Sequence, residues 1–247
     1  MIPGQLITEP VWSAELASEA LRDELWRANT GRLLTPTIFN TMRILKRVNP
    51  ADTYMENYLW HAEKQGWRFF DQYHLAWIWG AFRRPLRILE IGTRTGISLC
   101  QLLSAMVDHE GVEAHCFDLF NDGFVTPKLV ELNLKALNLP VSAVQFHTGP
   151  SAQTVPEFRK QQLSESFATI SFDWILVDGD HDKTAARIDL ENVVDLVAPG
   201  GILVFDDVAP DGCDLLDVWE AFRADHPEGF WYGQDLNGKG TAWAIKQ

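Results

Sequence analysis

Acidic side chains end two apolar runs in the second half of the chain. The run WILV ends at Asp178, and the run GILVF ends at Asp206 and Asp207. If these runs form adjacent parallel strands, the three carboxylates meet at one edge of the sheet. Crowded carboxylates repel one another unless protons or counter-charges settle them. We therefore expect a divalent cation, Mg²⁺ or a similar ion, which binds carboxylate oxygens and can also hold a substrate hydroxyl.

Two further polar residues follow the first run, in the sequence Asp178-Gly179-Asp180-His181. A hydroxyl bound by the cation and by Asp178 would have a lowered pKa, and a nearby base would take its proton. His181 is the predicted base because a neutral imidazole titrates near working pH, and Asp180 is the alternative. Asp180 and His181 could instead only cap the helix that begins near Lys183.

A glycine-containing turn follows an earlier apolar run, in the sequence LEIGTRTGIS that begins at Leu89. Glycine permits positive φ and a close approach of the backbone to a ligand, and the amides of the turn favour an anionic group. Gly92 and Gly96 are separated by three residues, whereas a dinucleotide site has the spacing G-x-G-x-x-G. The turn therefore suits the carboxylate of an amino-acid cofactor better than NAD. A tight turn without a ligand is the simpler alternative.

Asp118 ends the next apolar run, about 20 residues after Gly96. An acid at this place accepts the ribose hydroxyls in nucleotide-binding sheets. Asp118 is therefore a predicted cofactor residue.

These patterns resemble a known group of enzymes. The pattern E-x-G-x-x-x-G from Glu90 to Gly96 resembles motif I of class I S-adenosylmethionine-dependent methyltransferases. The endings D-G-D-H and apolar-D-D resemble methyltransferase family 24 and the metal-dependent O-methyltransferases that act on sugars and phenols. The resemblance covers Arg83 to Gln247. Arg94 departs from the commoner third glycine of motif I. Many family 24 members have His where Asp206 stands, so Asp206 favours a metal here.

The resemblance implies the transfer of a methyl group from S-adenosylmethionine to a hydroxyl of a small molecule. It implies that Asp178, Asp206 and Asp207 hold the metal. Ser151 follows the third strand, where a small polar residue lies near the adenine, but it could equally cap the next helix. The implied cofactor residues are Glu90, Gly92, Thr93, Gly96, Ser98, Asp118, Ser151 and Asp178.

Short apolar runs alternate with amphipathic stretches from Arg87 onward, which is typical of a mostly parallel sheet with crossover helices. This pattern predicts a Rossmann-like, doubly wound α/β fold with a mostly parallel, seven-stranded sheet. The predicted strands are Arg87–Ile91, Glu113–Asp118, Ala143–His147, Trp174–Asp178 and Gly201–Asp206. The predicted helices are Gly96–Val107, Pro127–Leu137, Gln153–Gln162, Lys183–Val197 and Cys213–Ala224. The segments FWYGQ and TAWAIK flank a turn at Asn237-Gly238, which predicts a hairpin with an antiparallel strand at the sheet edge.

The N-terminal third is predicted to be helical, so we divide the chain into a helical segment, 1–82, and a cofactor-binding domain, 83–247. Tryptophans 60, 67, 77 and 79 crowd the first part, and such residues usually lie in a core or an interface. The segment could cover the acceptor pocket as a lid or form a homodimer interface. The predicted helices begin at Ser13 and then cover Thr37–Lys46, Ala51–Gln65 and Phe70–Phe82.

Composition excludes several classes of protein. The net charge of −13 disfavours nucleic acid as a partner. The three cysteines show no CxxC spacing, which indicates neither disulfides nor a thiolate metal site and favours the cytoplasm. Neither a signal peptide nor an uncharged membrane span is apparent. The expected partner is a small-molecule acceptor.

Two other functions compete with methyl transfer. A cephalosporin-hydroxylase-like relative or a catalytically silent module would keep the fold and the cofactor, and loss of the three aspartates would have favoured it. A nicotinamide-dependent oxidoreductase is disfavoured by the glycine spacing and by the absence of a Tyr-x-x-x-Lys pair.

Overall fold

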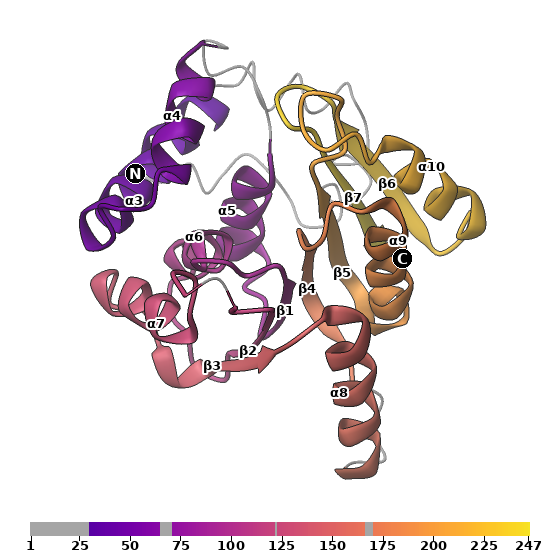
Figure 1. The fold of residues 1–247 in the computed structure, drawn as a ribbon. Helices are drawn as coiled ribbons and strands as arrows, with labels where there is room; N and C mark the ends of the chain where they lie inside the picture. The colour runs from indigo at the N-terminus through magenta and orange to yellow at the C-terminus, as the bar shows by residue number, and fades with distance from the viewer. Residues whose placement is uncertain (1–29, 65–70, 122, 166–169) are drawn as a thin grey trace.

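The structure is a computed structural model that describes residues 30–64, 71–121, 123–165 and 170–247 (Figure 1). Its central sheet has seven strands in the order β3-β2-β1-β4-β5-β7-β6. The chain winds from β1 outward through β2 and β3, and then in the other direction through β4 and β5. The switch point between β1 and β4 is where ligands bind in sheets of this kind. The predicted doubly wound α/β fold is confirmed.

All the predicted strands are present, and most bounds agree within two residues. β5 is the exception, because it begins four residues before the predicted start at Gly201. Pro199 and Gly200 predict a break, but β4 pairs with β5 on both sides of them, with a shift of register between Phe172 and Trp174. The shift of register therefore accommodates Pro199 and Gly200 within β5, and the strand continues past them. The strands are β1 (Arg87–Ile91), β2 (Glu113–Asp118), β3 (Val144–Thr148), β4 (Phe172–Val177), β5 (Val197–Asp206), β6 (Phe230–Asp235) and β7 (Thr241–Lys246).

The C-terminal hairpin completes the sheet. β7 pairs antiparallel with β5, and β6 pairs antiparallel with β7 at the edge. The predicted antiparallel pairing at this edge is confirmed, with β7 placed one strand inward from β6.

The helices agree with the predicted alternation. α9 ends at Val193 and passes into a 3-10 turn, Val194–Leu196, so the predicted end at Val197 is too late. The helix predicted from Ser13 lies outside the described residues. The helices are α3 (Thr30–Val48), α4 (Tyr54–Lys64), α5 (Gln72–Phe82), α6 (Ile97–Ala105), α7 (Pro127–Ala136), α8 (Ser151–Glu165), α9 (Lys183–Val193) and α10 (Leu216–Asp225).

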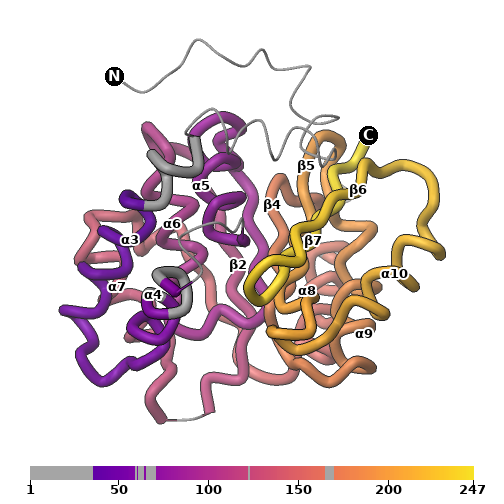
Figure 2. Tube along the Cα trace, turned by 90° about the horizontal axis from the view of Figure 1, so that it is seen from above, coloured from indigo at the N-terminus to yellow at the C-terminus, as the bar shows by residue number. Residues whose placement is uncertain are grey.

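The helices form a layer on each face of the sheet (Figure 2). Helices α3 to α7 lie on one side, and α8, α9 and α10 lie on the other. Successive strand residues point to opposite faces, so Ile88 belongs to the first apolar core and Leu89 to the second. β4 and β5 are buried on both faces along most of their length, which explains why they are apolar runs without polar alternation.

The described part of the N-terminal segment belongs to the first of these cores. Leu75, Ile78 and Trp79 of α5 are buried in the same cluster as Leu102 of α6 and Ile88 of β1. The division of the chain at residues 82 and 83 stays a prediction. Among the described helices, none combines the length and the apolarity needed to cross a bilayer.

Candidate active site

The turn after β1 is built on Gly92, which has a φ of +81°. A Cβ atom at Gly92 would lie 1.8 Å from the carbonyl oxygen of Asp178, so any side chain would collide with the end of β4. The amide of Gly92 donates to the carbonyl of Phe117 at 2.8 Å, which joins the turn to the end of β2. Gly92 therefore lets the ends of three adjacent strands meet closely.

Gly96 permits close packing between two helices. It has a φ of +74° at the N-cap of α6, and a Cβ there would lie 2.7 Å from Cγ1 of Val130 in α7. Gly96 thus lets α6 start beside α7, and its role in this structure is packing.

Glu90 lies at the end of β1 and is 2% exposed. Burial raises the pKa of its carboxyl to about 8, and the charge of Asp178 adds to the effect. Within the described part of the chain, its Oε2 atom has no hydrogen-bond partner. Glu90 therefore lies beneath the glycine turn as a buried carboxyl with unused bonding capacity.

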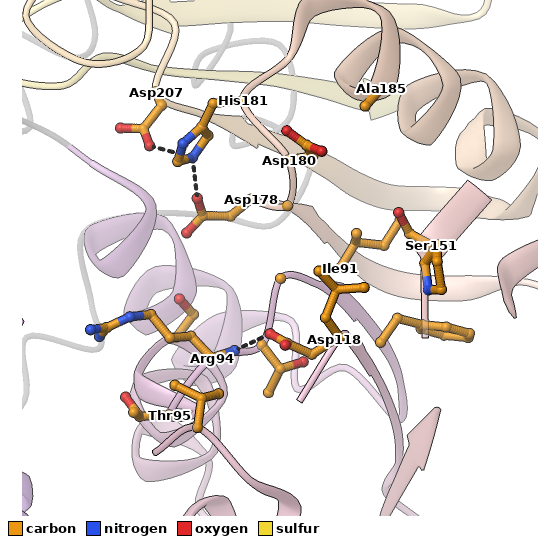
Figure 3. Close-up of a pocket in the computed structure, with 18 of the residues that line it drawn as sticks. Ile91, Arg94, Thr95, Asp118, Ser151, Asp178, Asp180, His181, Ala185 and Asp207 are labelled. Atoms are coloured by element: carbon orange, nitrogen blue, oxygen red, sulfur yellow. Dashed lines mark hydrogen bonds and ion pairs between the residues drawn. The ribbon is translucent and has the colours of Figure 1, made fainter. Parts of the chain in front are cut away.

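Asp118 lies at the end of β2 with its carboxylate held by the backbone. The amide of Arg94 donates to Oδ2 at 2.7 Å (Figure 3). The amide of Phe120 donates to Oδ1 at 2.9 Å. Arg94 and Phe120 both have positive φ, so two unusual backbone conformations aim these donors. Each oxygen keeps a lone pair for a further donor.

These features surround one cavity of about 820 Å³. At the other end of the cavity, Asp178, the residue after β4, faces His181 and Asp207 (Figure 3). Of the predicted site residues, those that line it are Gly92, Thr93, Ser98, Asp118, Ser151, Asp178, Asp180, His181 and Asp207. The other predicted residues, Glu90, Gly96 and Asp206, do not line the cavity.

The three aspartates predicted as metal ligands do meet. Asp178, Asp206 and Asp207 each offer a carboxylate oxygen, and these oxygens lie within 4.8 Å of one another. The Asp178 side chain is 21% exposed, whereas those of Asp206 and Asp207 are 4% and 1% exposed. Parallel pairing of β4 with β5 brings them together, because it aligns the carboxyl ends of both strands. We call this group the acidic corner.

Gln72 and Lys239, which the sequence did not single out, contact the acidic corner. Gln72 Nε2 donates to Oδ2 of Asp178 at 3.0 Å and to Oδ2 of Asp206 at 2.9 Å. Lys239 Nζ lies 2.5 Å from Oδ1 of Asp207 and 3.9 Å from Oδ2 of Asp206. Gln72 opens α5, and Lys239 lies in the turn between β6 and β7. No short motif marks Gln72, whereas the turn sequence NGKG could have drawn attention to Lys239.

The charges of the acidic corner are largely balanced from within the chain. Burial and the charges of Asp178 and Asp207 raise the pKa of Asp206 well above its usual range. Burial also acts to raise the pKa of Asp207, but the hydrogen bond from His181 and the charge of Lys239 outweigh it and lower this pKa. Burial opposes the charged form of Lys239, yet Tyr54 and the aspartates raise its pKa.

His181 lies between two of the aspartates. Its Nε2 atom is 3.1 Å from Oδ2 of Asp207 and 3.9 Å from Oδ1 of Asp178. Hydrogen bonds to Asp178 and Asp207 raise the pKa of His181 to about 10. The imidazole is therefore protonated at neutral pH in this arrangement and acts as a hydrogen-bond donor.

The cap of α9 is neither Asp180 nor His181. Asp182 is the N-cap, and its side chain accepts from the amides of Thr184 and Ala185. Asp180 accepts from the amide of Asp182 at 2.9 Å, so it shapes the preceding turn. His181 is left to face the cavity.

The N-terminal helices supply part of the cavity wall. Tyr54 of α4 and Tyr73 of α5 line it, and their hydroxyls are 3.0 Å apart. Arg94 lies over the Tyr54 ring, 4.6 Å from its centroid, and pairs with buried Asp52 at 3.4 Å. Residues from before the sheet and from the glycine turn therefore meet beside the acidic corner.

Part of the chain matches a known family of domains. Residues 89–208, just under half of the chain, match the family model of a methyltransferase domain, Methyltransf_24. A search of curated proteins finds no match to the chain.

Solved structures share the fold at low sequence identity. An O-methyltransferase from Bacillus cereus in complex with SAH is 19% identical, over 71% of this chain and 79% of that chain, with a TM-score of 0.53. The O-methyltransferase TomG from Streptomyces achromogenes, in complex with SAM, is 20% identical over the same shares of the two chains, 71% and 79%, with a TM-score of 0.56. The chain thus has the fold of class I S-adenosylmethionine-dependent methyltransferases, and its residues 89–208 are similar to the methyltransferase domains of family 24.

Proposed function

We propose that this protein transfers the methyl group of S-adenosylmethionine to a hydroxyl oxygen of a small molecule. The observation that carries the proposal is the single cavity that joins the Asp118 end to the Asp178 end (Figure 3). One end has the groups that suit a nucleoside with an amino-acid tail. The other end has charged groups that suit a reacting hydroxyl.

The chain's residues fit the cofactor. The Asp118 carboxylate, fixed by two backbone amides, would accept the ribose hydroxyls. The backbone at Gly92 and Thr93 would hold the methionine part, with the Glu90 carboxyl beneath it. Apolar residues of the cavity wall suit a flat base, and they include Leu119, Val125, Pro150 and Ala152. The cofactor supplies a methyl group on a positively charged sulfur, which is open to attack by an oxygen.

Asp178 is the group best placed to orient the acceptor hydroxyl. It lines the cavity, and one of its oxygens is held by Gln72. We assign to it the hydrogen bond from the hydroxyl and the acceptance of the proton. His181 and Lys239 place positive charge beside the same spot, which favours an oxygen that is losing its proton. This assignment replaces the predicted base, His181, because a protonated imidazole has no lone pair to offer.

A divalent metal at the acidic corner is the alternative that the sequence favours. Carboxylate oxygens are suitable ligands for Mg²⁺. However, the Gln72 amide and the Lys239 ammonium already occupy the space between the carboxylates, so the residues as arranged do not fit a metal.

The cysteines bear on the cellular compartment of the protein. Cys100, Cys116 and Cys213 are all free thiols, and the first two are buried. Free thiols suit a reducing compartment, so we propose the cytoplasm.

Calorimetric titration of the full chain tests the cofactor. We expect S-adenosylmethionine to bind and NAD to have no effect. Asp118→Asn should weaken binding of S-adenosylmethionine about 10- to 100-fold, because it removes charge-assisted hydrogen bonds. The exposed Asp108→Asn variant is the matched control and should bind as the wild type does. Unchanged binding in Asp118→Asn would remove the cofactor assignment.

Incubation with methyl-labelled S-adenosylmethionine and a panel of phenols and sugars then tests the transfer. The expected product carries the label on oxygen, as detected by mass spectrometry and NMR. Binding of the cofactor without transfer to any acceptor would instead favour a catalytically silent module.

A further inference from the structure

Each carboxylate group of the acidic corner contacts side chains of the chain itself. Gln72 Nε2 bridges the Oδ2 atoms of Asp178 and Asp206, and Thr241 Oγ1 donates to Asp206 Oδ1 at 2.6 Å. His181 faces Oδ2 of Asp207 and, at 3.9 Å, Oδ1 of Asp178. Lys239 takes the remaining oxygen, Oδ1 of Asp207, at 2.5 Å.

This pairing leaves poor access for a divalent ion. Mg²⁺ needs oxygen lone pairs at about 2.1 Å in near-octahedral geometry. At the acidic corner, an amide N–H group lies between Asp178 and Asp206, and an ammonium lies against Asp206 and Asp207. N–H donors cannot ligate a metal, and the ammonium would repel one. A metal would therefore have to displace Lys239 and turn the Gln72 amide.

The backbone fixes Lys239 in this place. The carbonyl of Lys239 accepts from the amide of Ala209 at 2.9 Å, and the carbonyl of Gly240 accepts from the amide of Val208 at 3.1 Å. A Cβ at Gly240 would lie 2.4 Å from the nitrogen of Ala209. The turn between β6 and β7 is thus held against the segment that follows Asp207.

Gln72 is fixed with similar firmness. Asp71 caps α5 by accepting from the amides of Tyr73 and His74, in a capping box with the His74 side chain. Ser98 Oγ donates to Oε1 of Gln72 at 3.3 Å, which sets its amide with Nε2 toward the aspartates. Gln72 is 1% exposed.

We propose that the Lys239 ammonium is the permanent cation of the acidic corner, in the place where related sites would use a divalent metal, and that the wild-type corner binds no such metal. Lys239 lines the cavity beside Asp178, so its ammonium can also donate to the acceptor oxygen. That second role rests on the proposed function, whereas the exclusion of metal does not.

Binding of Mn²⁺ to the full chain without cofactor tests the proposal, with the electron paramagnetic resonance signal of the free ion as readout. The wild type should leave this signal unchanged up to about 1 mM Mn²⁺. Lys239→Met keeps the length of the side chain but removes its charge, so the aspartates lose their cation. In metal-free buffer this variant should melt about 4 °C or more below the wild type. It should also bind Mn²⁺, and Asp207→Asn in the same variant should abolish that binding.

Lys135→Met removes an exposed lysine of α7 and is the matched control. It should change neither the melting temperature nor the Mn²⁺ signal.

Two results support the inference together: an unchanged Mn²⁺ signal in the wild type and a lowered melting temperature in Lys239→Met. One equivalent of Mn²⁺ bound by the wild type and lost in Asp207→Asn overturns it. A Lys239→Met variant as stable as Lys135→Met also overturns it. Neither readout depends on S-adenosylmethionine, so failure here is distinct from failure of the proposed function.

Discussion

At the residue scale, the buried carboxyl of Glu90 makes the stability of the folded protein depend on pH. Its carboxyl is buried at the end of β1, and its pKa of about 8 means that the folded protein holds a proton there at neutral pH. The unfolded chain would lose that proton near pH 4.5, the ordinary value for the carboxyl. Between these values the folded state binds more protons than the unfolded state, so stability falls as pH rises.

We expect Glu90→Gln to reduce this pH dependence. In the absence of cofactor, the free energy of unfolding of the wild type should fall between pH 5 and 8, with a contribution from Glu90 of roughly 3 kcal/mol. Glutamine keeps the shape and does not titrate, so the variant should lose that contribution. Urea unfolding at several pH values measures it. The exposed Glu110→Gln is the control, and identical slopes in all three proteins would show that Glu90 is not the titrating group.

At the scale of the elements, the ends of β1, β2 and β4 converge because the residue after β1 is a glycine and has no side chain. Gly92 allows the end of β1 to approach the carbonyl of Asp178, while its amide bonds to Phe117 at the end of β2. Gly111 provides a contrast, since its φ of +76° is similar but a Cβ there would meet nothing within 4 Å.

Gly92→Ala and Gly111→Ala should therefore differ sharply. Gly111→Ala carries only the cost of a side chain at positive φ, about 1–2 kcal/mol. Gly92→Ala adds a collision with the backbone of β4, and we expect a loss of roughly 3–5 kcal/mol of stability together with a lower yield of soluble protein. Urea unfolding compares the two variants. Equal losses would contradict the close packing of the strand ends.

For the whole molecule, binding of S-adenosylmethionine at the strand ends should stabilise the folded state against global unfolding. S-adenosylmethionine at about 100 times its dissociation constant adds about 2.7 kcal/mol to the free energy of unfolding. For a chain of this length that corresponds to a rise in melting temperature of about 5–10 °C. Differential scanning fluorimetry measures the shift, with NAD at the same concentration as the control. A shift with NAD and none with S-adenosylmethionine would favour an oxidoreductase.

The order of strands and helices was determined by the sequence itself. Apolar runs that are buried on both faces, and the glycines and capping residues between them, are local signals, and they predicted the doubly wound sheet. The acidic endings at Asp118, Asp178, Asp206 and Asp207 were predictable for the same reason. Parallel strands bring their carboxyl ends to one edge whatever the loops do.

Only the tertiary structure decided what surrounds those acids. Gln72 and Lys239 reach the acidic corner from far apart in the sequence, one through the docking of α5 and the other through the turn between β6 and β7. Their contacts depend on packing between distant segments, which no local pattern encodes. For the same reason, the sequence predicted a metal as the counter-charge, whereas the folded chain places Lys239, His181 and Gln72 against the three aspartates.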